Sequence, residues 1–447
     1  MNSSTQTCRF LSVALVCVAL ALAPASVVLS QSGSSLDLRQ NVIAGGGGGS
    51  TGSGNMRVDG TAGQPAAGTQ MSGGTLTQVG GFWPAIQGLP SALPVVQFSL
   101  SSYTVSEGQP RVDIALTRSG DTTRSAAVGF ATNDAAGLTN CNVFNGIASP
   151  RCDFEYTLGT MSFAPGETSK SFSVAIVDDS YAEGNESFTV NLSGPSGATL
   201  GAQSTATVTI IDNDNSNGPN PIENTNFFVR QQYIDFLGRE PDPPGFAGWT
   251  STINNCSGDT TQCDRIHVSQ LFFQSAEFQT RGYFVYRFYP VAFGRKPDYA
   301  EFVPDLASVS GFLSDAQLEA AKVQFIADFM ARPAFANTYN GLNNQQYVDM
   351  LLNTAGVMLS SRQAMIDGLN NSTLKRAQVL RQIVESPEVT TRYNHQAYAV
   401  MEYFGYLRRQ PDAFYLAWIQ VLDQTNDPRG MVTGFVSSLE YRARFGP

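Results

Sequence analysis

Carboxylates gather in the first half of the chain at the ends of short β-branched runs, and their side chains suit cation binding. Glu107 follows the run 103–106, an acidic segment extends from Asp178 to Glu186, and Asp212 and Asp214 follow the run 205–211. Ca²⁺ takes roughly six to eight oxygen ligands from flexible sets of carboxylates and carbonyls. These residues could therefore bind calcium, provided that the fold brings them together.

The elements that must position these carboxylates are short strands between residues 95 and 214. Alternating runs separated by turn residues about every ten positions are typical of a β-sandwich. We expect strands at 96–100, 111–117, 126–131, 161–163, 171–177, 187–192 and 205–211. Because each strand reverses the one before it, alternate loops share a pole. The segments at that pole contain Glu107, Asp134, Asp153, Asp178, Asp179, Glu183, Glu186, Asp212 and Asp214.

So many carboxylates at one pole would repel one another unless a cation lay among them. One or two Ca²⁺ ions fit this supply of oxygens. Acidic residues also commonly serve only to solvate loops, and that is the simpler explanation for any single Asp-Asp pair. The convergence of four separate segments favours calcium binding.

Several motifs of this stretch follow one another in the order of a known family. They include Tyr103-Thr104-Val105-Ser106-Glu107-Gly108, Val177-Asp178-Asp179 and Ile211-Asp212-Asn213-Asp214. Residues 94–214 resemble a Calx-beta domain, an immunoglobulin-like sandwich whose members often bind Ca²⁺ at the distal loops. The resemblance implies the calcium ligands Glu107, Asp134, Asp178, Asp179, Glu183, Glu186, Asp212 and Asp214. The sequence departs from the family before the fourth strand, where Cys152-Asp153-Phe154 follows an insertion and replaces the usual Gly-x-Asp-Tyr.

The N-terminus is typical of a secretory signal peptide at residues 1–30, with Arg9, an apolar run at 11–23 and small residues after it. A retained membrane anchor is the alternative, although Pro24 interrupts the apolar run. We therefore expect a secreted or cell-surface protein with no membrane span in the mature chain. Residues 31–93 read as a disordered spacer rich in Gly and Ser, and residues 215–224 as a second linker.

Four cysteines remain once Cys8 and Cys17 are removed with the signal peptide. An even number in an exported chain predicts disulfides. Of the three pairings that are possible, we favour the local one, Cys141 with Cys152 and Cys256 with Cys263. Zinc binding is the competing interpretation, but neither spacing is Cys-x-x-Cys.

Residues 225–447 change to helical periodicity and contain an internal repeat. Tyr233, Tyr289, Tyr347 and Tyr403 are spaced by about 56, 58 and 56 residues, which indicates four copies of a helical unit. A Gly-Arg-x-Pro-Asp turn follows the tyrosine in the first two copies, and Arg409-Gln410-Pro411-Asp412 continues it in the fourth. A later landmark, Ser-x-Glu-Phe in the first copy, recurs in modified form. We expect the Asp of the turn to be a helix N-cap.

This repeat resembles the DUF4214 domain and, more distantly, phycobilisome linker repeats. The resemblance implies an all-α repeat domain, common in exported and surface proteins of bacteria, and it implies no particular chemistry. The predicted fold is therefore multidomain, with an immunoglobulin-like all-β sandwich followed by an all-α helical repeat domain.

Composition and motifs limit the function. A net charge of −10 with 14% charged residues argues against nucleic-acid binding. Only His267 and His395 could serve as histidine bases, and HExxH and Walker motifs are absent. We expect no catalytic residues and a calcium-binding protein with an adhesion or matrix role, in which Ca²⁺ stiffens the joint to the helical domain. Its partner would be a surface protein or a polysaccharide. The alternative is a polysaccharide-binding or polysaccharide-modifying enzyme with the sandwich as an accessory module and the recurring aromatics lining a sugar groove.

Overall fold

The computed structural model describes residues 48–51, 57–60, 70–73, 76–79, 92–137 and 141–447. The chain divides into two compact units, residues 1–90 and 91–447, which are considered separately. The predicted signal peptide lies outside the described residues. Where a structureless spacer is predicted, the described residues form two antiparallel pairs: β1 (Gly48–Thr51) with β2 (Arg57–Gly60), and β3 (Gln70–Gly73) with β4 (Leu76–Val79). β-branched residues such as Val58 and Val79 favour strands over the surrounding Gly and Ser.

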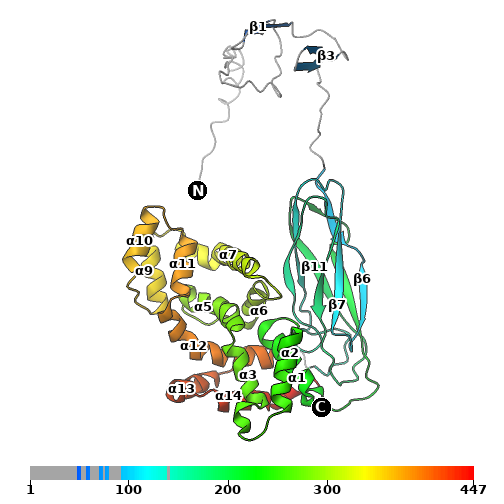
Figure 1. Cartoon of the computed structure of the whole chain (residues 1–447), viewed down its shortest axis with the longest axis vertical. Helices are drawn as coiled ribbons and strands as arrows, with labels where there is room; N and C mark the ends of the chain where they lie inside the picture. Colours follow the sequence, from blue (N-terminus) through cyan, green and yellow to red (C-terminus); the bar gives the residue numbers. More distant parts are fainter. Residues whose placement is uncertain (1–47, 52–56, 61–69, 74–75, 80–91, 138–140) are drawn as a thin grey trace, which may run out of the picture. The chain divides into compact units, whose positions relative to one another are not determined.

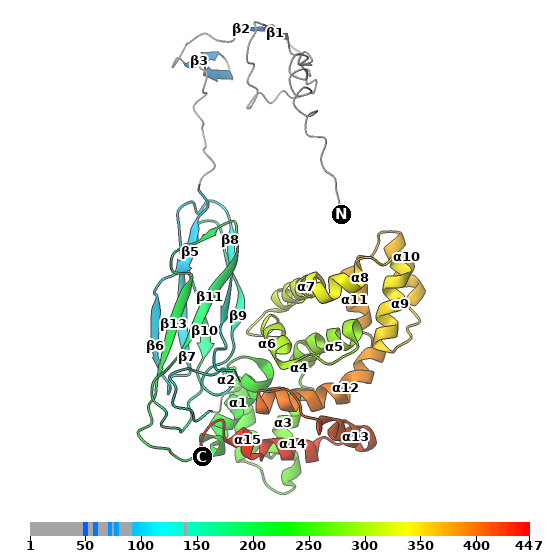
Figure 2. The same cartoon turned by 180° about the vertical axis from the view of Figure 1, so that it is seen from behind.

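A β-sandwich of two sheets opens the second unit, which confirms the predicted fold class (Figures 1 and 2). Its strands are β5 (Val95–Phe98), β6 (Ser102–Ser106), β7 (Arg111–Ser119), β8 (Ala126–Thr132), β9 (Leu158–Phe163), β10 (Ser169–Ala175), β11 (Glu186–Ser196), β12 (Thr199–Leu200) and β13 (Thr205–Ile211). One sheet has the order β10-β7-β5-β12, and the other has the order β6-β13-β11-β8-β9. Alternate residues of β7, β8 and β13 are buried between the sheets, as the period of two in the sequence predicts.

The first strand of the sandwich divides between the two sheets, which the sequence did not predict. β5 pairs antiparallel with β7, whereas β6 crosses to the other sheet and pairs parallel with β13. Parallel neighbours end at the same edge of a sheet. The backbone N–H of Glu107, after β6, therefore donates to the carbonyl of Ile211 at the end of β13 (3.0 Å). This pairing holds the acidic residues that follow the two strands side by side.

A helical region follows the sandwich, again as predicted (Figure 1). Its α-helices are α1 (Thr225–Leu237), α2 (Pro243–Asn254), α3 (Arg265–Gln274), α4 (Ala276–Thr280), α5 (Gly282–Phe293), α6 (Tyr299–Ala307), α7 (Asp315–Ala331), α8 (Pro333–Tyr339), α9 (Asn344–Ala355), α10 (Arg362–Asn370), α11 (Arg376–Val384), α12 (Pro387–Glu402), α13 (Tyr415–Thr425), α14 (Arg429–Val436) and α15 (Leu439–Arg442). A π-helical turn, η3 (Tyr403–Leu407), continues α12. The four repeat tyrosines, Tyr233, Tyr289, Tyr347 and Tyr403, are all buried in one core.

The two landmarks of the repeat are joined by a salt bridge. In the first copy the Arg239 guanidinium donates two hydrogen bonds to Glu277 of the Ser-x-Glu motif, from Nε (2.7 Å) and Nη2 (2.6 Å). In the fourth copy Arg409 binds Glu440 in the same two-pronged way, at 2.6 and 2.9 Å. Two parallel N–H donors match the two oxygens of a carboxylate. The pair therefore fixes the relative orientation of the two side chains as well as compensating their charges. The turn motif therefore clamps the start of the repeat to its later helix.

The second and third copies have each changed one landmark. Ala334 replaces the glutamate in the second copy, and Arg295 binds Glu301 of its own turn instead (2.7 Å). The third copy has Val357 where the others have the arginine. The clamp is therefore a feature of the first and fourth copies.

The turn after the tyrosine helix needs a left-handed residue in every copy. Gly238, Gly294 and Gly356 have φ of 60°, 66° and 63°, and each ends its helix. In the fourth copy Arg408 occupies this position with φ of 52°. A side chain in this conformation costs roughly 1–2 kcal/mol, so contacts of Arg408 must offset the strain.

Candidate metal centre

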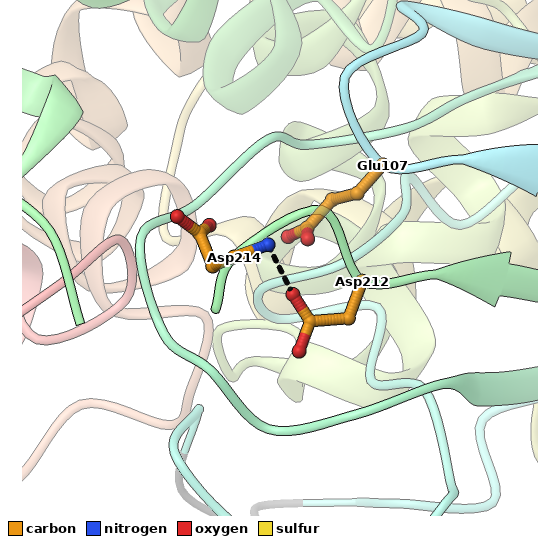
Figure 3. Close-up of side chains that lie close together, drawn as sticks. All are labelled: Glu107, Asp212 and Asp214. Carbon is orange, nitrogen blue, oxygen red and sulfur yellow. Dashed lines mark hydrogen bonds between the residues drawn. The ribbon is translucent and has the colours of Figure 1, made fainter. Parts of the chain in front are cut away.

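The ends of β6 and β13 bring together the first group of carboxylates, here called the outer group. Oxygens of Glu107, Asp212 and Asp214 lie within 4.8 Å of one another (Figure 3). The Asp214 backbone N–H donates to Oδ1 of Asp212 (2.7 Å), which folds the Asp-Asn-Asp turn back on itself. Asp178 lies beside this group, where its Oδ1 accepts a hydrogen bond from Nδ2 of Asn213 (3.0 Å).

A second set of carboxylates, the inner group, comes from two other loops at the same pole. Oxygens of Asp153, Asp179 and Glu183 also lie within 4.8 Å of one another. Glu186, at the start of β11, lies close to this set, and burial together with the neighbouring charge of Asp153 raises its pKa. All four side chains are buried, and Oδ1 of Asp153 and Oδ2 of Asp179 have no hydrogen-bond partner among the described residues.

Backbone N–H groups tie the inner and outer groups together. Oε1 of Glu107 accepts a hydrogen bond from the N–H of Asp179 (3.1 Å). Oδ2 of Asp212 accepts from the N–H groups of Glu183 (3.0 Å) and Gly184 (2.7 Å). The loop that carries Asp179 and Glu183 is therefore positioned by carboxylates of the outer group, so the two groups form one centre.

Burial and mutual repulsion shift the acid–base behaviour of this centre. Burial, reinforced by neighbouring carboxylates, raises the pKa of Glu107 to about 8, that of Asp179 to about 10 and that of Glu183 to about 9. Burial also raises the pKa values of Asp153 and Glu186. The charges that act most strongly on Glu107 are those of Asp153, Asp178 and Asp212, all negative. Without a cation, the fold therefore favours protonated carboxyl groups here.

The donor chemistry of the centre fits calcium. The side chains that converge are carboxylates, and hard oxygen ligands of this kind suit Ca²⁺, whereas softer metals favour His or Cys. Two carboxylates whose oxygens are 4.8 Å apart repel by roughly 3 kcal/mol at an effective dielectric constant of 20. A divalent cation would remove this repulsion and would supply a partner for the unpaired oxygens of Asp153 and Asp179.

The structure brings together seven of the eight residues predicted as calcium ligands. Glu107, Asp212 and Asp214 lie in the outer group with Asp178 beside them, and Asp179, Glu183 and Glu186 lie in or against the inner group. Asp134 lies outside both groups, is exposed, and accepts a hydrogen bond from the N–H of Gly137 (2.7 Å).

Asp153 belongs to the inner group, although the predicted ligand set does not contain it. It lies in Cys152-Asp153-Phe154, the segment that replaces the family's Gly-x-Asp-Tyr motif. Strand parity had placed this segment at the correct pole. Aligning it with the family motif across the insertion would have favoured Asp153 over Asp134.

The four cysteines within the described residues are paired locally. Cys141 is bonded to Cys152 beside the centre, and Cys256 is bonded to Cys263 between α2 and α3. No helix in the part of the chain that the structure describes is long and apolar enough to cross a membrane.

Comparison with known proteins identifies the sandwich. Residues 91–214 match the Calx-beta domain family and are a Calx-beta domain. The chain is 37% identical over 119 residues to sodium/calcium exchanger 1 of Felis catus, which covers 23% of this chain and 11% of that protein. It is 32% identical over 120 residues to sodium/calcium exchanger Calx of Drosophila melanogaster, which covers 27% of this chain and 12% of that protein.

Among solved structures, the apo-form Calx CBD1 domain is 32% identical, covers 27% of this chain and 99% of its own, and has a TM-score of 0.24. The chain thus spans about a tenth of the length of the exchangers that it matches. The similarity concerns the sandwich.

Proposed function

We propose that this protein is an exported calcium-binding protein in which Ca²⁺ occupies the inner and outer groups of the Calx-beta domain. The observation that carries the proposal is the pair of buried carboxylate oxygens without partners, on Asp153 and Asp179, within a centre whose other charges are also negative. Groups of this kind are expensive to keep in a folded protein unless a ligand compensates them. The matching exchanger domains support calcium as that ligand.

Calcium would also stiffen the joint between the sandwich and the helical region. The sequence suggested the linker 215–224 as the route, and the structure offers a more direct one. The N–H and hydroxyl of Ser180, next to Asp179, donate to the carbonyl of Phe445 (2.9 and 3.1 Å), and the hydroxyl of Tyr181 donates to the carbonyl of Ala443 (3.2 Å). The loop that carries the inner ligands therefore touches the C-terminal segment of the helical region.

Charged contacts close the same joint. Arg408 donates to both carboxylate oxygens of Glu155 in the sandwich (3.2 and 2.8 Å) and also to Asp235 of α1. Arg444 binds Asp235 and donates from Nε to the backbone carbonyl of Arg151. Glu155 is two residues after Asp153, so both segments of the inner group lead directly into the joint. Ordering these segments with Ca²⁺ would favour the docked arrangement.

An adhesion or matrix role at the cell surface follows from this design as the working hypothesis. A signal peptide, a spacer and a calcium-stiffened pair of domains would together present a rigid surface outside the cell. The resemblance of residues 225–447 to DUF4214 supports an exported setting and stays a prediction. The partner would be a surface protein or polysaccharide.

One observation counts against the enzymatic alternative. The four repeat tyrosines that could have lined a sugar groove are core residues. We therefore retain the binding protein as the proposed function.

A calorimetric Ca²⁺ titration of the purified full chain tests the proposal. We expect saturable binding and a rise in melting temperature with Ca²⁺, because a ligand that binds only the folded state stabilises it. The variant Asp153→Asn should bind more weakly by at least tenfold. Mg²⁺ at the same concentration is the control for general screening. A chain that shows neither heat of binding nor a shift in melting temperature would refute the function.

A further inference from the structure

The inserted loop 141–152, which the disulfide closes, forms one wall of the inner group. A small cavity at this wall is lined by Cys141, Val143, Asn145, Ile147 and Ser149 of the loop and by Asp153, Glu183 and Glu186. It has a volume of about 10 Å³, close to the lower limit for one water-sized occupant. Asp153, Glu183 and Glu186 therefore face the loop across a space where a small ligand could sit.

The loop also sets the position of Asp153. The backbone N–H groups of Cys152 and Asp153 both donate to the carbonyl of Ser149 (3.2 and 2.9 Å). In return, Oδ2 of Asp153 accepts the N–H of Ser149, which leaves Oδ1 buried and without a hydrogen-bond partner in the part of the chain that the structure describes. This tight turn ends at Cys152, whose bond to Cys141 anchors it to the far end of the loop. The orientation of the free oxygen thus depends on a turn that the disulfide closes.

The disulfide contacts the second ligand segment as well. Cys141, Cys152 and Tyr181 form a small buried cluster of their own. Tyr181 lies midway between Asp179 and Glu183, and its N–H donates to Oδ1 of Asp179 (2.8 Å). The remainder of the loop is fastened to β11, where the N–H of Ala148 donates to the carbonyl of Ser187, next to Glu186. All the segments that supply inner carboxylates therefore adjoin this loop.

We propose that the disulfide-closed loop 141–152 is a part of the inner metal centre and that the Cys141–Cys152 bond controls its affinity for Ca²⁺. The proposal rests on the proposed function and adds a regulator to it. Reduction by a dithiol breaks the S–S bond: two electrons and two protons pass to the cysteines, which become thiols, and the dithiol closes to a disulfide. The freed loop gains conformational entropy, the turn that holds Asp153 loses its anchor, and the contact with Tyr181 loosens. Oxidation of the exported chain would therefore complete the site.

The first experiment compares calcium binding of three full-length proteins by calorimetry. These are the oxidised wild type, the double variant Cys141→Ser/Cys152→Ser and the matched control Cys256→Ser/Cys263→Ser, which removes the disulfide of the helical region. We expect the first variant to lose at least tenfold in affinity at one class of sites and to keep the other, because the outer group lies on other loops. The control should bind as the wild type does. Wild-type affinity at every site in the first variant would overturn the proposal.

The second experiment needs only the wild type and so does not depend on whether a variant folds. The protein is equilibrated in buffers with stepped ratios of reduced to oxidised dithiothreitol, with and without Ca²⁺, and the reduced fraction of each disulfide is measured by thiol alkylation and mass spectrometry. Calcium binding and disulfide closure must favour each other to the same extent in free energy. We therefore expect Ca²⁺ to shift the equilibrium constant of Cys141–Cys152 at least tenfold towards the disulfide and to leave that of Cys256–Cys263 unchanged.

The outcomes separate the two proposals. Equal equilibrium constants for Cys141–Cys152 with and without Ca²⁺, in a chain that binds Ca²⁺, would sink the loop proposal and leave the calcium function standing. A wild type that binds no Ca²⁺ would refute both.

Discussion

At the scale of single residues, two effects raise the free energy of the charged carboxylates in the inner group. Asp179 and Glu183 are removed from water, and each is also close to other carboxylates. Hydrogen bonds from backbone N–H groups, such as that of Tyr181 to Asp179, offset only part of this cost. The centre is therefore destabilising when it lacks a cation and stabilising when it holds one.

Asp179→Asn should separate these two effects. The amide has nearly the same shape but no charge, so the Ca²⁺-free variant should melt above the Ca²⁺-free wild type. With saturating Ca²⁺ the order should reverse, because the variant lacks a charged ligand and binds at least tenfold more weakly. Differential scanning fluorimetry in EDTA and in Ca²⁺ measures both. Asp134→Asn, outside both groups, keeps its contact to Gly137 and should leave both melting temperatures unchanged. If the melting temperature of the Asp179 variant differed from that of the wild type in the same direction in both buffers, the prediction would be wrong.

The pH dependence of the Ca²⁺-free protein follows from the same shifts. The pKa values of Glu107, Asp179 and Glu183 are raised from ordinary carboxyl values to about 8, 10 and 9. Between about pH 5 and pH 9 the folded chain thus binds more protons than the unfolded chain, and stability falls as pH rises. We expect the melting temperature in EDTA to fall over this range and the fall to shrink when Ca²⁺ is bound. Melting temperatures at each pH, with and without Ca²⁺, provide the test, and a flat EDTA profile would argue against buried protonated carboxyls.

At the scale of elements, the fourth repeat has an arginine where the other copies have a glycine, and this arginine contacts the sandwich. Arg408 takes the left-handed position that Gly238, Gly294 and Gly356 occupy in the other copies. Its side chain is almost fully buried between Glu155 of the sandwich and Asp235 of α1. The strain of the backbone is thus compensated by two charged contacts that no glycine could make.

Arg408→Ala should destabilise the protein by about 3 kcal/mol, since Glu155 would remain buried without its cation. Arg408→Gly should be less harmful by about 1 kcal/mol, because glycine relieves the left-handed strain. Arg295→Ala, which removes a more exposed pair with Glu301, is the control and should cost less than about 1 kcal/mol. Urea denaturation of the four proteins gives these differences. Equal stability of the Arg408 and Arg295 variants would show that the buried contact contributes little.

At the scale of the whole molecule, the carboxylate centre and the helical region share one boundary. The C-terminus lies beside α1 in both views (Figures 1 and 2). Phe445 packs edge-on against Phe227 of α1, and its carbonyl accepts the N–H of Ser180. The C-terminal segment 443–446 therefore connects the inner ligand loop to the helical core.

Deleting residues 443–447 should weaken Ca²⁺ binding several-fold, because binding and docking are linked and the linkage is reciprocal. The same deletion should raise hydrogen exchange at residues 178–183 even when Ca²⁺ is present. Calorimetry and exchange mass spectrometry measure the two effects, and Pro447 deleted alone is the control. Conversely, EDTA should expand the wild type in small-angle scattering. An unchanged radius together with unchanged affinity after the deletion would show that the two domains act independently.

Local pattern was sufficient for much of this description. The period of two predicted the sandwich, and strand parity predicted the shared pole. These two patterns also predicted that seven of the proposed ligands lie together. They could do so because the alternation of side chains along a strand and the reversal of the chain between strands depend on residues that are close in sequence. The repeat spacing likewise predicted four helical units, each with its tyrosine.

Only the tertiary structure decided which acidic residues at the pole lie together and which other parts of the molecule they contact. The crossing of β6 to the second sheet, the choice of Asp153 over Asp134 and the contact of Ser180 with Phe445 each depend on residues far apart in the chain. The partner of Arg408, 253 positions away, could not be inferred from the repeat, where the position calls for glycine. Burial and electrostatic coupling arise from packing in three dimensions, so the centre's raised pKa values and its link to the helical region appear only in the folded molecule.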